Sequence, residues 1–448
     1  MKWLIKIPGI LTRWLPCALL ILAVASCSTP AEHSDLERTM ERYRPRDRKP
    51  SLPALTATSP VSDFITYAVL NNPRAEAAFY DWKSTVEEIA VAGSWPDPQL
   101  TLSAEIDRVV MKTLIGFMQE IPGPGKLALR AETVSAQAQK KRYLFEEELL
   151  KTAFEIKQVY YQVFLLKEKI RLTKELVALA DAQAGSARAG FQTGLNRVDD
   201  VTMVRSEQDR LYNELANLED SAKPLMARWR GVLGIPPGNE NPPLPEAALP
   251  ANTLPQDSDL LKEALENNVQ LKALAAEIRQ AQALVELAYK GNVPDFGVGL
   301  ALDAQKTPMT QMPELNMTFP IWRKRIGAEI AAARARKRQA QAELKAEEIN
   351  LSVLLAEKTF TWRQLQRESL LISEQLIPRA KLNADSLNAE YKTGQTTMTN
   401  WLNARRELVE LLIRLAEANA ERETVFAEIT LMAASRSPAE IARIFAPE

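Results

Sequence analysis

The chain contains almost no side chains capable of thiol or imidazole chemistry. Its 448 residues include two cysteines, Cys17 and Cys27, both near the N-terminus, and a single histidine, His33. Disulfide frameworks, thiolate metal sites and Ser-His-Asp catalysis are therefore excluded from the body of the chain. We predict no catalytic residue, no metal site and no cofactor, hence no enzyme, and we interpret His33 as a solvated bystander in a polar tail.

Glycine and net charge are also low. The chain has 16 glycines, and 56 Lys and Arg against 57 Asp and Glu give a formal charge of -1. The lack of excess basic charge argues against bulk attraction to nucleic acid. An apolar fraction of 46% with 25% charged residues excludes global disorder. Abundant Ala, Leu, Glu, Lys, Arg and Gln with little glycine predict long helices.

The N-terminus has the pattern of an export signal. Residues 1–26 contain three basic and no acidic side chains, followed by an apolar run that is too short for a membrane-spanning helix. The signal ends Val-Ala-Ser before Cys27, which resembles the lipobox of bacterial lipoproteins, where the cysteine is acylated (palmitate) and becomes the first mature residue. Ser28 fits outer-membrane sorting. A signal with an incidental cysteine is the alternative. Residues 27–60 show no periodicity and are predicted to be a lipid tether and N-terminal tail.

The rest of the chain consists of two sequence repeats, which indicates an internal duplication. Asn71-Asn72 recurs as Asn267-Asn268, and further landmarks recur in the same order at offsets that drift by only four residues. The other landmarks are Pro96-Asp97 with Pro294-Asp295, Pro122 with Pro320, Phe191 to Gly194 with Tyr391 to Gly394, and Arg205 with Arg405. We predict a first repeat over 61–235, a Pro-rich linker over 236–257, a second repeat over 258–435 and a C-terminal tail over 436–448.

Each repeat contains a stretch of period-two alternation, which predicts a hairpin of strands. Strands of this length cross a bilayer when tilted, but four strands cannot close a barrel and open edges are not tolerated in lipid. Three chains would supply about a dozen strands around an aqueous lumen. A soluble four-stranded sheet is the alternative. The predicted strands are about 98–108, 112–121, 296–304 and 312–320, and Glu105, Asp107, Asp303 and Glu314 on their polar faces are interpreted as lumen lining.

Outside the hairpins the pattern is helical. Apolar residues recur every seven positions from Leu149 to Val177, and no proline occurs between Lys126 and Gly190, which predicts a helix of about 65 residues. The second repeat has the same pattern from about 325 to 390, interrupted by Pro378. Each long helix ends at a Thr-Gly pair, so coiled-coil tips are predicted near Gly194 and Gly394.

Together, the lipobox, the duplicated helix, strand hairpin and helix, and the glycine turn in a long coiled coil resemble the outer-membrane factor family of TolC-type efflux channels. The resemblance covers about 60–435 and includes the segment from Gln119 to Leu127. It implies a mainly α fold with a small β part, in a homotrimer whose 12-stranded outer-membrane β-barrel continues into a periplasmic α-helical coiled-coil barrel. It also implies a passive duct in a tripartite system, with a periplasmic adaptor and an inner-membrane transporter, the RND type being one option.

The resemblance also implies a gate at the periplasmic tips. Asp200 lies where the family commonly has an aspartate and Tyr391 where it commonly has an aromatic residue, so a hydroxyl-to-carboxylate hydrogen bond would link neighbouring hairpins. Asp199 and Asp200 are alternatively ordinary acids at a helix N-terminus. Some members have two inward aspartates where this chain has Asn400 and Asn403, so a charged ring is not expected. Arg205 and Arg405 are candidates for either adaptor contact or intrachain ion pairing.

Several features remain open. Trp95 and Trp322 flank the strands and are candidates for an interfacial girdle, and Met309 and Met312 are weak candidates for soft Cu(I) ligands. A periplasmic coiled-coil lipoprotein with a structural role competes with the duct, although it leaves the alternating strands unexplained. An outer-membrane duct for type I protein secretion is a further alternative.

Overall fold

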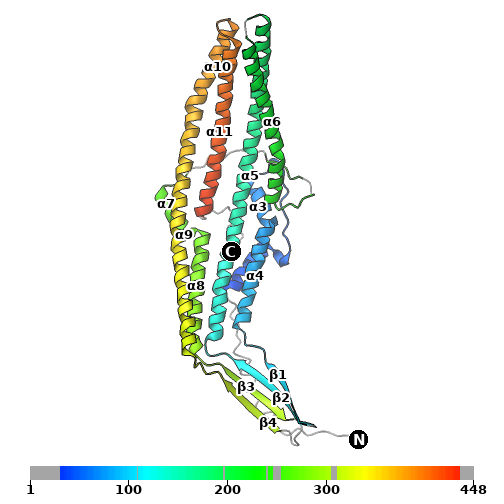
Figure 1. The fold of residues 1–448 in the computed structure, drawn as a ribbon, viewed down its shortest axis with the longest axis vertical. Coiled ribbons are helices and arrows are strands. Elements are labelled where there is room, and N and C mark those ends of the chain that lie inside the picture. Colours follow the sequence, from blue (N-terminus) through cyan, green and yellow to red (C-terminus); the bar gives the residue numbers. More distant parts are fainter. Residues whose placement is uncertain are drawn as a thin grey trace, which may run out of the picture.

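The computed structural model describes residues 31–107, 109–194, 197–238, 241–245, 254–303 and 310–433. The molecule is a long rod with a sheet at one end and two helical hairpin tips at the other (Figure 1). In chain order the elements are α2 (Ala31–Tyr43), η2 (Pro45–Asp47), α3 (Val61–Asn71), α4 (Pro73–Gly93), β1 (Gln99–Asp107), β2 (Val109–Ile121), α5 (Lys126–Gln192), α6 (Val198–Val232), α7 (Asp257–Asn267), α8 (Val269–Tyr289), η3 (Lys290–Asn292), β3 (Phe296–Asp303), β4 (Thr310–Met317), α9 (Arg323–Leu371), η4 (Ile372–Leu376), α10 (Ile377–Lys392) and α11 (Met398–Ala433).

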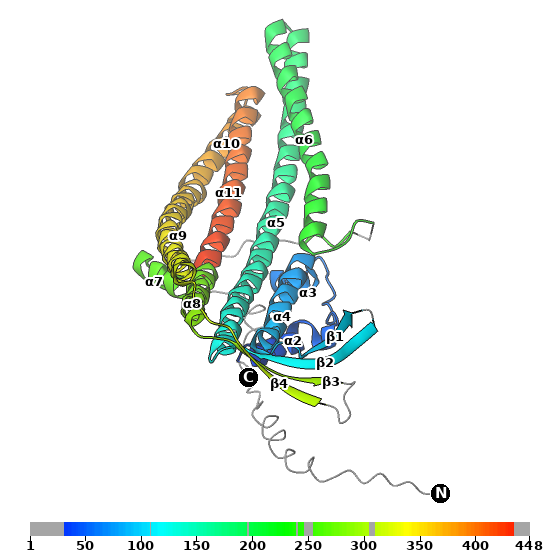
Figure 2. The ribbon, with the colours of Figure 1, turned by 60° about the horizontal axis from the view of Figure 1, so that its bottom comes forward.

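The order of elements confirms the predicted fold class, mainly helical with two tandem copies of one unit. Two helices, a strand hairpin and two long helical arms appear as α3 to α6 and again as α7 to α11. In both views the α5–α6 and α10–α11 arms extend away from the sheet, and α11 packs along α5 (Figures 1 and 2). The helices of the described ranges include none that is long and apolar enough to cross a membrane.

The repeated Asn-Asn pair has a structural role in both copies. Asn72 accepts a hydrogen bond from the backbone N–H of Arg74 and caps α4, and Asn268 accepts one from Leu271 and caps α8. These bonds satisfy backbone donors that have no partner inside the helix. The pair also fastens each unit to the end of its last helix, because Asn71 donates to the carbonyls of residues 233 and 234 and Asn268 donates to that of residue 432.

The four strands form one antiparallel sheet in the order β1-β2-β3-β4. In its register Leu100 pairs with Phe117, Phe117 with Leu300, and Leu300 with Pro313. These partners share one face, since residues directly opposite each other in a ladder point the same way. The opposite face includes Thr101, with Gly116, Ala301 and Met312 following it across the ladder.

The last strand differs from its predicted range of 312–320. β4 covers Thr310–Met317, and the backbone N–H of Thr318 donates to the carbonyl of Asp295, one position beyond the β3–β4 pairing in the same register. Pro320 has no N–H to donate, so the chain turns out of the sheet before it.

The long arms differ between the copies at one point. α5 runs unbroken for 67 residues, and its predicted heptad residues Leu149, Ile156 and Val163 are buried. In the second copy the helix widens into the π-helical turn η4 immediately before α10. Pro378 lies in the first turn of α10, where it removes a backbone donor and crowds the carbonyl four residues earlier. The first copy has Ala178 at the corresponding position, which explains its regular helix.

The prediction that residues 27–60 form a lipid tether and N-terminal tail is wrong for residues 31–43. Residues 31–43 form α2, and Tyr43 at its end is fully buried with its ring 5.0 Å from that of Phe145 and 5.2 Å from that of Phe79. Leu36 is buried on the same helix. His33 therefore lies in a half-buried position of a packed helix and not in a solvated tail.

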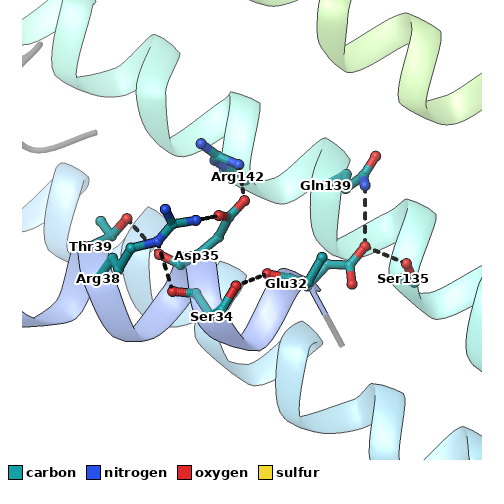
Figure 3. A network of polar contacts seen from close by, with 9 residues as sticks. Glu32, Ser34, Asp35, Arg38, Thr39, Ser135, Gln139 and Arg142 are labelled. Carbon is teal, nitrogen blue, oxygen red and sulfur yellow. Dashed lines mark hydrogen bonds and ion pairs between the residues drawn. The ribbon is translucent and has the colours of Figure 1, made fainter. Parts of the chain in front are cut away.

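Polar contacts fasten α2 along α5 (Figure 3). The carboxylate of Glu32 accepts hydrogen bonds from Ser135 at 2.6 Å and Gln139 at 3.2 Å, and Asp35 pairs with Arg142. Two consecutive turns of α2 thus contact one face of α5. This segment is held by side chains from distant parts of the sequence, which is why its own short pattern gave no clear signal.

Several predicted features lie outside the described residues. They are the signal over 1–26, the lipidation site Cys27, the C-terminal tail over 436–448, most of the second half of the Pro-rich linker, and Met309. The side chains of Glu105, Asp107 and Asp200 also lie outside them.

Candidate functional site

One face of the sheet is apolar and exposed along all four strands. Leu102, Phe117, Val298 and Leu315 are exposed by 72%, 51%, 49% and 75%, and they belong to β1, β2, β3 and β4 respectively. A continuous apolar face of this kind marks an interaction site and is costly to leave in water. The opposite face includes Asp303, which is buried, and Glu314, which is exposed, both predicted to line a lumen.

The two helical tips have nearly the same backbone. Gly194 and Gly394 have φ of 74° and 73°, a left-handed conformation that favours glycine, and each follows a threonine whose hydroxyl donates to carbonyls of the preceding turn. At the second tip, the N–H of Gln395 closes the helix on the carbonyl of Glu390 at 2.8 Å. These are the turns expected at 194 and 394, and they reverse each chain arm into the next helix.

Tyr391 has a partner that the sequence reasoning missed. Its ring stacks on Trp401 of α11, with centroids 6.0 Å apart and planes within 6° of parallel. The contact joins the two arms of the second tip. The first copy has Phe191 and Val201 at these positions, so the aromatic pair is a property of the second tip alone. Two aromatic residues on either side of a predicted glycine turn were a signal that could have identified it.

The acidic side of the predicted gate is only partly described. Asp199, in the first turn of α6, pairs with Arg197 at 3.3 Å, and both side chains are largely exposed. An acid at this position also interacts favourably with the positive end of the helix dipole, as the alternative interpretation expects. The bond between Asp200 and Tyr391 stays a prediction.

Asn400 and Asn403 have different surroundings. The backbone N–H of Asn400 donates to the hydroxyl of Thr397, which caps the start of α11, and its side chain donates to Thr396. Asn403 accepts a hydrogen bond from the amide of Gln183 on α5 at 3.0 Å. Asn403 therefore joins the second hairpin to the first within one chain.

Further contacts join the two hairpins, and together with the Asn403 contact they are called the seam below. Arg405 on α11 pairs with Glu175 on α5 at 2.6 Å, and Arg406 pairs with Glu207 on α6 at 3.3 Å. Arg405 is thus engaged in an intrachain ion pair, one of its two predicted roles, whereas Arg205 is exposed on α6. The hydrogen bond from Arg210 is the main reason that the pKa of Glu207 lies below its ordinary value, and Arg406 contributes to the same effect.

A second polar cluster fixes the junction between sheet and helices. The carboxylate of Asp295 accepts hydrogen bonds from the backbone N–H of Gly123 at 2.6 Å and from Lys126 at 2.8 Å. Partial burial raises the pKa of Asp295, but these two donors outweigh it and lower the pKa overall. One carboxylate thereby connects the start of α5 with the chain entering β3, which fixes the direction of the helices relative to the sheet.

The described residues contain no group of three or more metal-binding side chains. Met312 lies in β4, half-buried, opposite Ala301 of β3. Trp95 and Trp322 are both exposed, by 53% and 69%, beside the strands that they flank. Their role as a girdle stays a prediction.

An apolar sheet face at one end and paired helical tips at the other are the arrangement expected for an outer-membrane channel subunit. The family described as outer membrane efflux protein matches residues 260–435. CzcC of Cupriavidus metallidurans, named a cobalt-zinc-cadmium resistance protein, is 26% identical over 422 residues, which cover 90% of this chain and 94% of CzcC. The chain is thus similar to outer-membrane efflux proteins, to the family model in its second half and to CzcC over most of its length.

Two further proteins show the same similarity. The outer membrane efflux protein BepC of Brucella suis is 24% identical over 389 residues, covering 82% of each chain. The structure of the outer-membrane channel OprN superposes with a TM-score of 0.72 over 86% of this chain and 94% of that one, at 13% identity. At that identity the superposition supports the fold alone.

Proposed function

We propose that this protein is the outer-membrane channel of a tripartite efflux system, a passive duct for substrates delivered by an inner-membrane transporter and a periplasmic adaptor. One observation carries the proposal, the exposed apolar face that runs across all four strands while the helical arms extend away from the sheet. A lipid environment would satisfy that face, and three chains would close the sheet edges into one barrel. A purely periplasmic scaffold would leave the same face in water.

Neighbouring residues of β1 offer a matched test of the membrane face. Leu102 lies on the apolar face and Ser103 on the other face. We expect Leu102→Arg to impair membrane insertion by about 2–4 kcal/mol if the residue lies near the bilayer midplane, while Ser103→Arg inserts normally and alters ion selectivity. Insertion is measured by partitioning into outer-membrane vesicles, and conductance in planar bilayers. Equal insertion of both variants would contradict the proposal, as would an absence of conductance from wild-type protein that has assembled into trimers.

Lipid anchoring at Cys27 is part of the proposal. It is supported by the residues before the cysteine and by α2, which begins four residues after it and packs on α5 near the sheet end of that helix. An acyl chain on Cys27 would then lie close to the sheet. Mass spectrometry of the mature N-terminus should find the lipid in the wild type and not in Cys27→Ser, and an unmodified wild-type cysteine would contradict it.

The tips are proposed as the periplasmic gate and as the docking end for the adaptor. The duplicated glycine turns, the Tyr391–Trp401 stack and the seam through Arg405 support this role, because they set how far the second hairpin can move from the first. We expect Asp200→Ala combined with Tyr391→Phe to raise single-channel conductance. The matched control, Tyr212→Phe, removes a hydroxyl bonded to Asp181 away from the tip. Unchanged conductance in the double variant would contradict the gate assignment.

The name of one relative suggests which substrates to test first. Because CzcC is named for resistance to cobalt, zinc and cadmium, salts of these metals are the first substrates to test. We expect deletion of the gene to lower the tolerated metal concentration and a plasmid copy to restore it. Restored tolerance to drugs alone would assign the protein to drug efflux.

A further inference from the structure

A short apolar segment connects the sheet to α9 and is unusually exposed. Phe319, Ile321 and Trp322 are exposed by 66%, 66% and 69%. The segment is turned tightly, since the N–H of Ile321 donates to the carbonyl of Phe319 and that of Arg323 to the carbonyl of Ile321, each at 2.9 Å. Three large apolar side chains are therefore presented outward from a fixed backbone. Such a patch marks an interaction surface.

Three cations follow this segment directly. Arg323, Lys324 and Arg325 form the first turn of α9, and all three are exposed. This turn contains no acidic residue, and cations at a helix N-terminus face the positive end of the helix dipole. The charge is compensated only in part, because Arg323 bonds to the neutral Asn292 and Arg325 lies 3.5 Å from Glu329. An anionic partner would relieve this repulsion.

The corresponding junction in the first copy lacks both features. There the chain runs Ile-Pro-Gly-Pro-Gly before Lys126, without an aromatic residue, and Lys126 is already paired with Asp295. The apolar and cationic residues are therefore not a general requirement for turning from strand into helix. Of the two strand-to-helix junctions, both within the described ranges, the second carries this surface.

The position of the surface indicates its partner. It lies where the exposed apolar face of the sheet ends and the helices begin (Figure 1). Aromatic side chains favour the boundary between hydrocarbon and water, and Lys and Arg beside them attract anionic headgroups. A soluble anion would satisfy the cations but would leave the three apolar side chains in water. A lipid satisfies both.

We propose that Phe319 to Arg325 form a docking surface for a phosphate-bearing anionic phospholipid, with the headgroup on the cations and the acyl chains beside the apolar segment. The inference rests on the proposed function, since the sheet must lie in a membrane for the surface to meet lipid. It adds a preference among lipids that a membrane-embedded sheet does not by itself require.

The test compares lipid retained by the purified full-length protein. Wild type, Arg323→Gln/Lys324→Gln/Arg325→Gln and the control Arg336→Gln/Lys337→Gln/Arg338→Gln are reconstituted in an equimolar mixture of phosphatidylcholine and phosphatidylglycerol. The control removes the same charge about 20 Å further along the same helix. After gentle extraction, native mass spectrometry counts each bound lipid. We expect wild type and control to retain phosphatidylglycerol preferentially, and the first triple variant to lose this preference at least about tenfold, given up to about fivefold for each cation.

The outcomes separate this inference from the proposed function. Equal retention of the two lipids by wild type, or an equal loss of preference in both triple variants, overturns the docking surface. The proposed channel function still stands in that case if the wild type conducts in pure phosphatidylcholine bilayers. Absence of conductance from wild type in either bilayer overturns the proposed function itself. If the first triple variant does not assemble, the salt dependence of lipid retention by the wild type still tests the docking surface. Its preference should fall as salt rises, and a salt-independent preference overturns the assignment to the cations.

Discussion

Gly234, which follows α6 at the end of the first repeat, cannot accept a side chain without moving the backbone. Its φ of +69° is left-handed, and a Cβ added there would lie 2.5 Å from the carbonyl oxygen and 3.0 Å from the carbonyl carbon of Asn71. The same asparagine donates two hydrogen bonds, at 2.9 Å and 3.0 Å, to the carbonyls of Leu233 and Gly234. Gly234→Ala therefore strains both the residue and the contact that fastens α6 to α3.

The structure supplies a matched control for this substitution. Gly394 has a φ of +73° but open space around the position of an added Cβ. Gly394→Ala should therefore cost only the left-handed conformation, about 1–2 kcal/mol. Gly234→Ala adds the displacement of a packed backbone, about 1–3 kcal/mol, and weakens hydrogen bonds that contribute about 0.5–1.5 kcal/mol each. We expect the two variants to differ by about 2–3 kcal/mol.

Differential scanning calorimetry of the purified protein in one detergent, at one scan rate, measures this difference. For a chain of this length it corresponds to about 2–3 °C in Tm, since the unfolding entropy scales with the number of residues. Gly234→Ala should melt below Gly394→Ala by that interval. Equal melting temperatures would refute the reasoning, because they would mean that contact with Asn71 adds nothing to the conformational cost.

Three further predictions concern the seam and the N-terminal helix. Arg405→Gln should raise the open fraction of single channels about two- to fivefold, because its partly exposed pair with Glu175 contributes about 0.5–1 kcal/mol; unchanged gating with weakened adaptor binding would assign Arg405 to adaptor contact instead. The pKa of Glu207 is lowered from its ordinary value of 4.5 by Arg210, so its contribution to stability is present above that value and is lost as pH falls through the folded pKa. The wild type should therefore lose more thermal stability on acidification than Glu207→Gln. Parallel curves of Tm against pH for the two proteins would contradict a stabilising role of the Glu207 carboxylate. Asp35→Asn should increase hydrogen exchange over α2 without changing exchange at the tips, and unaltered protection of α2 would contradict the role of this carboxylate.

The architecture was predictable wherever a regular period persisted over many residues. Seven-residue spacing from Leu149 onward and alternation in the strands both reflect faces that repeat along one element, so neighbouring residues suffice to reveal them. α2 escaped the prediction because its apolar residues, Leu36, Met40 and Tyr43, fill only three turns. A helix that short is stable only through tertiary packing, here against aromatic residues far away in the sequence.

The contacts of the candidate site were less accessible from the sequence. The turns at Gly194 and Gly394 follow from local chemistry, since left-handed backbone after a helix calls for glycine. The partner of Arg405 lies 230 residues earlier in the chain, and only the packing of α11 against α5 determines it. Pairings across separate helices depend on the rotation of each helix about its axis, which a long heptad pattern does not fix closely.

The wide turn η4 takes up part of a length difference between the two arms. The arm from Pro122 to Gly194 spans 194 - 122 = 72 residues, whereas the arm from Pro320 to Gly394 spans 394 - 320 = 74. A π-helical hydrogen bond encloses one more residue than an α-helical one. The η4 turn is therefore wider, and it takes up an extra residue without lengthening the helix. One residue of the two-residue difference is thereby absorbed locally, and shortening the Ile372–Leu376 segment by one residue should be tolerated far better than a one-residue deletion in α9.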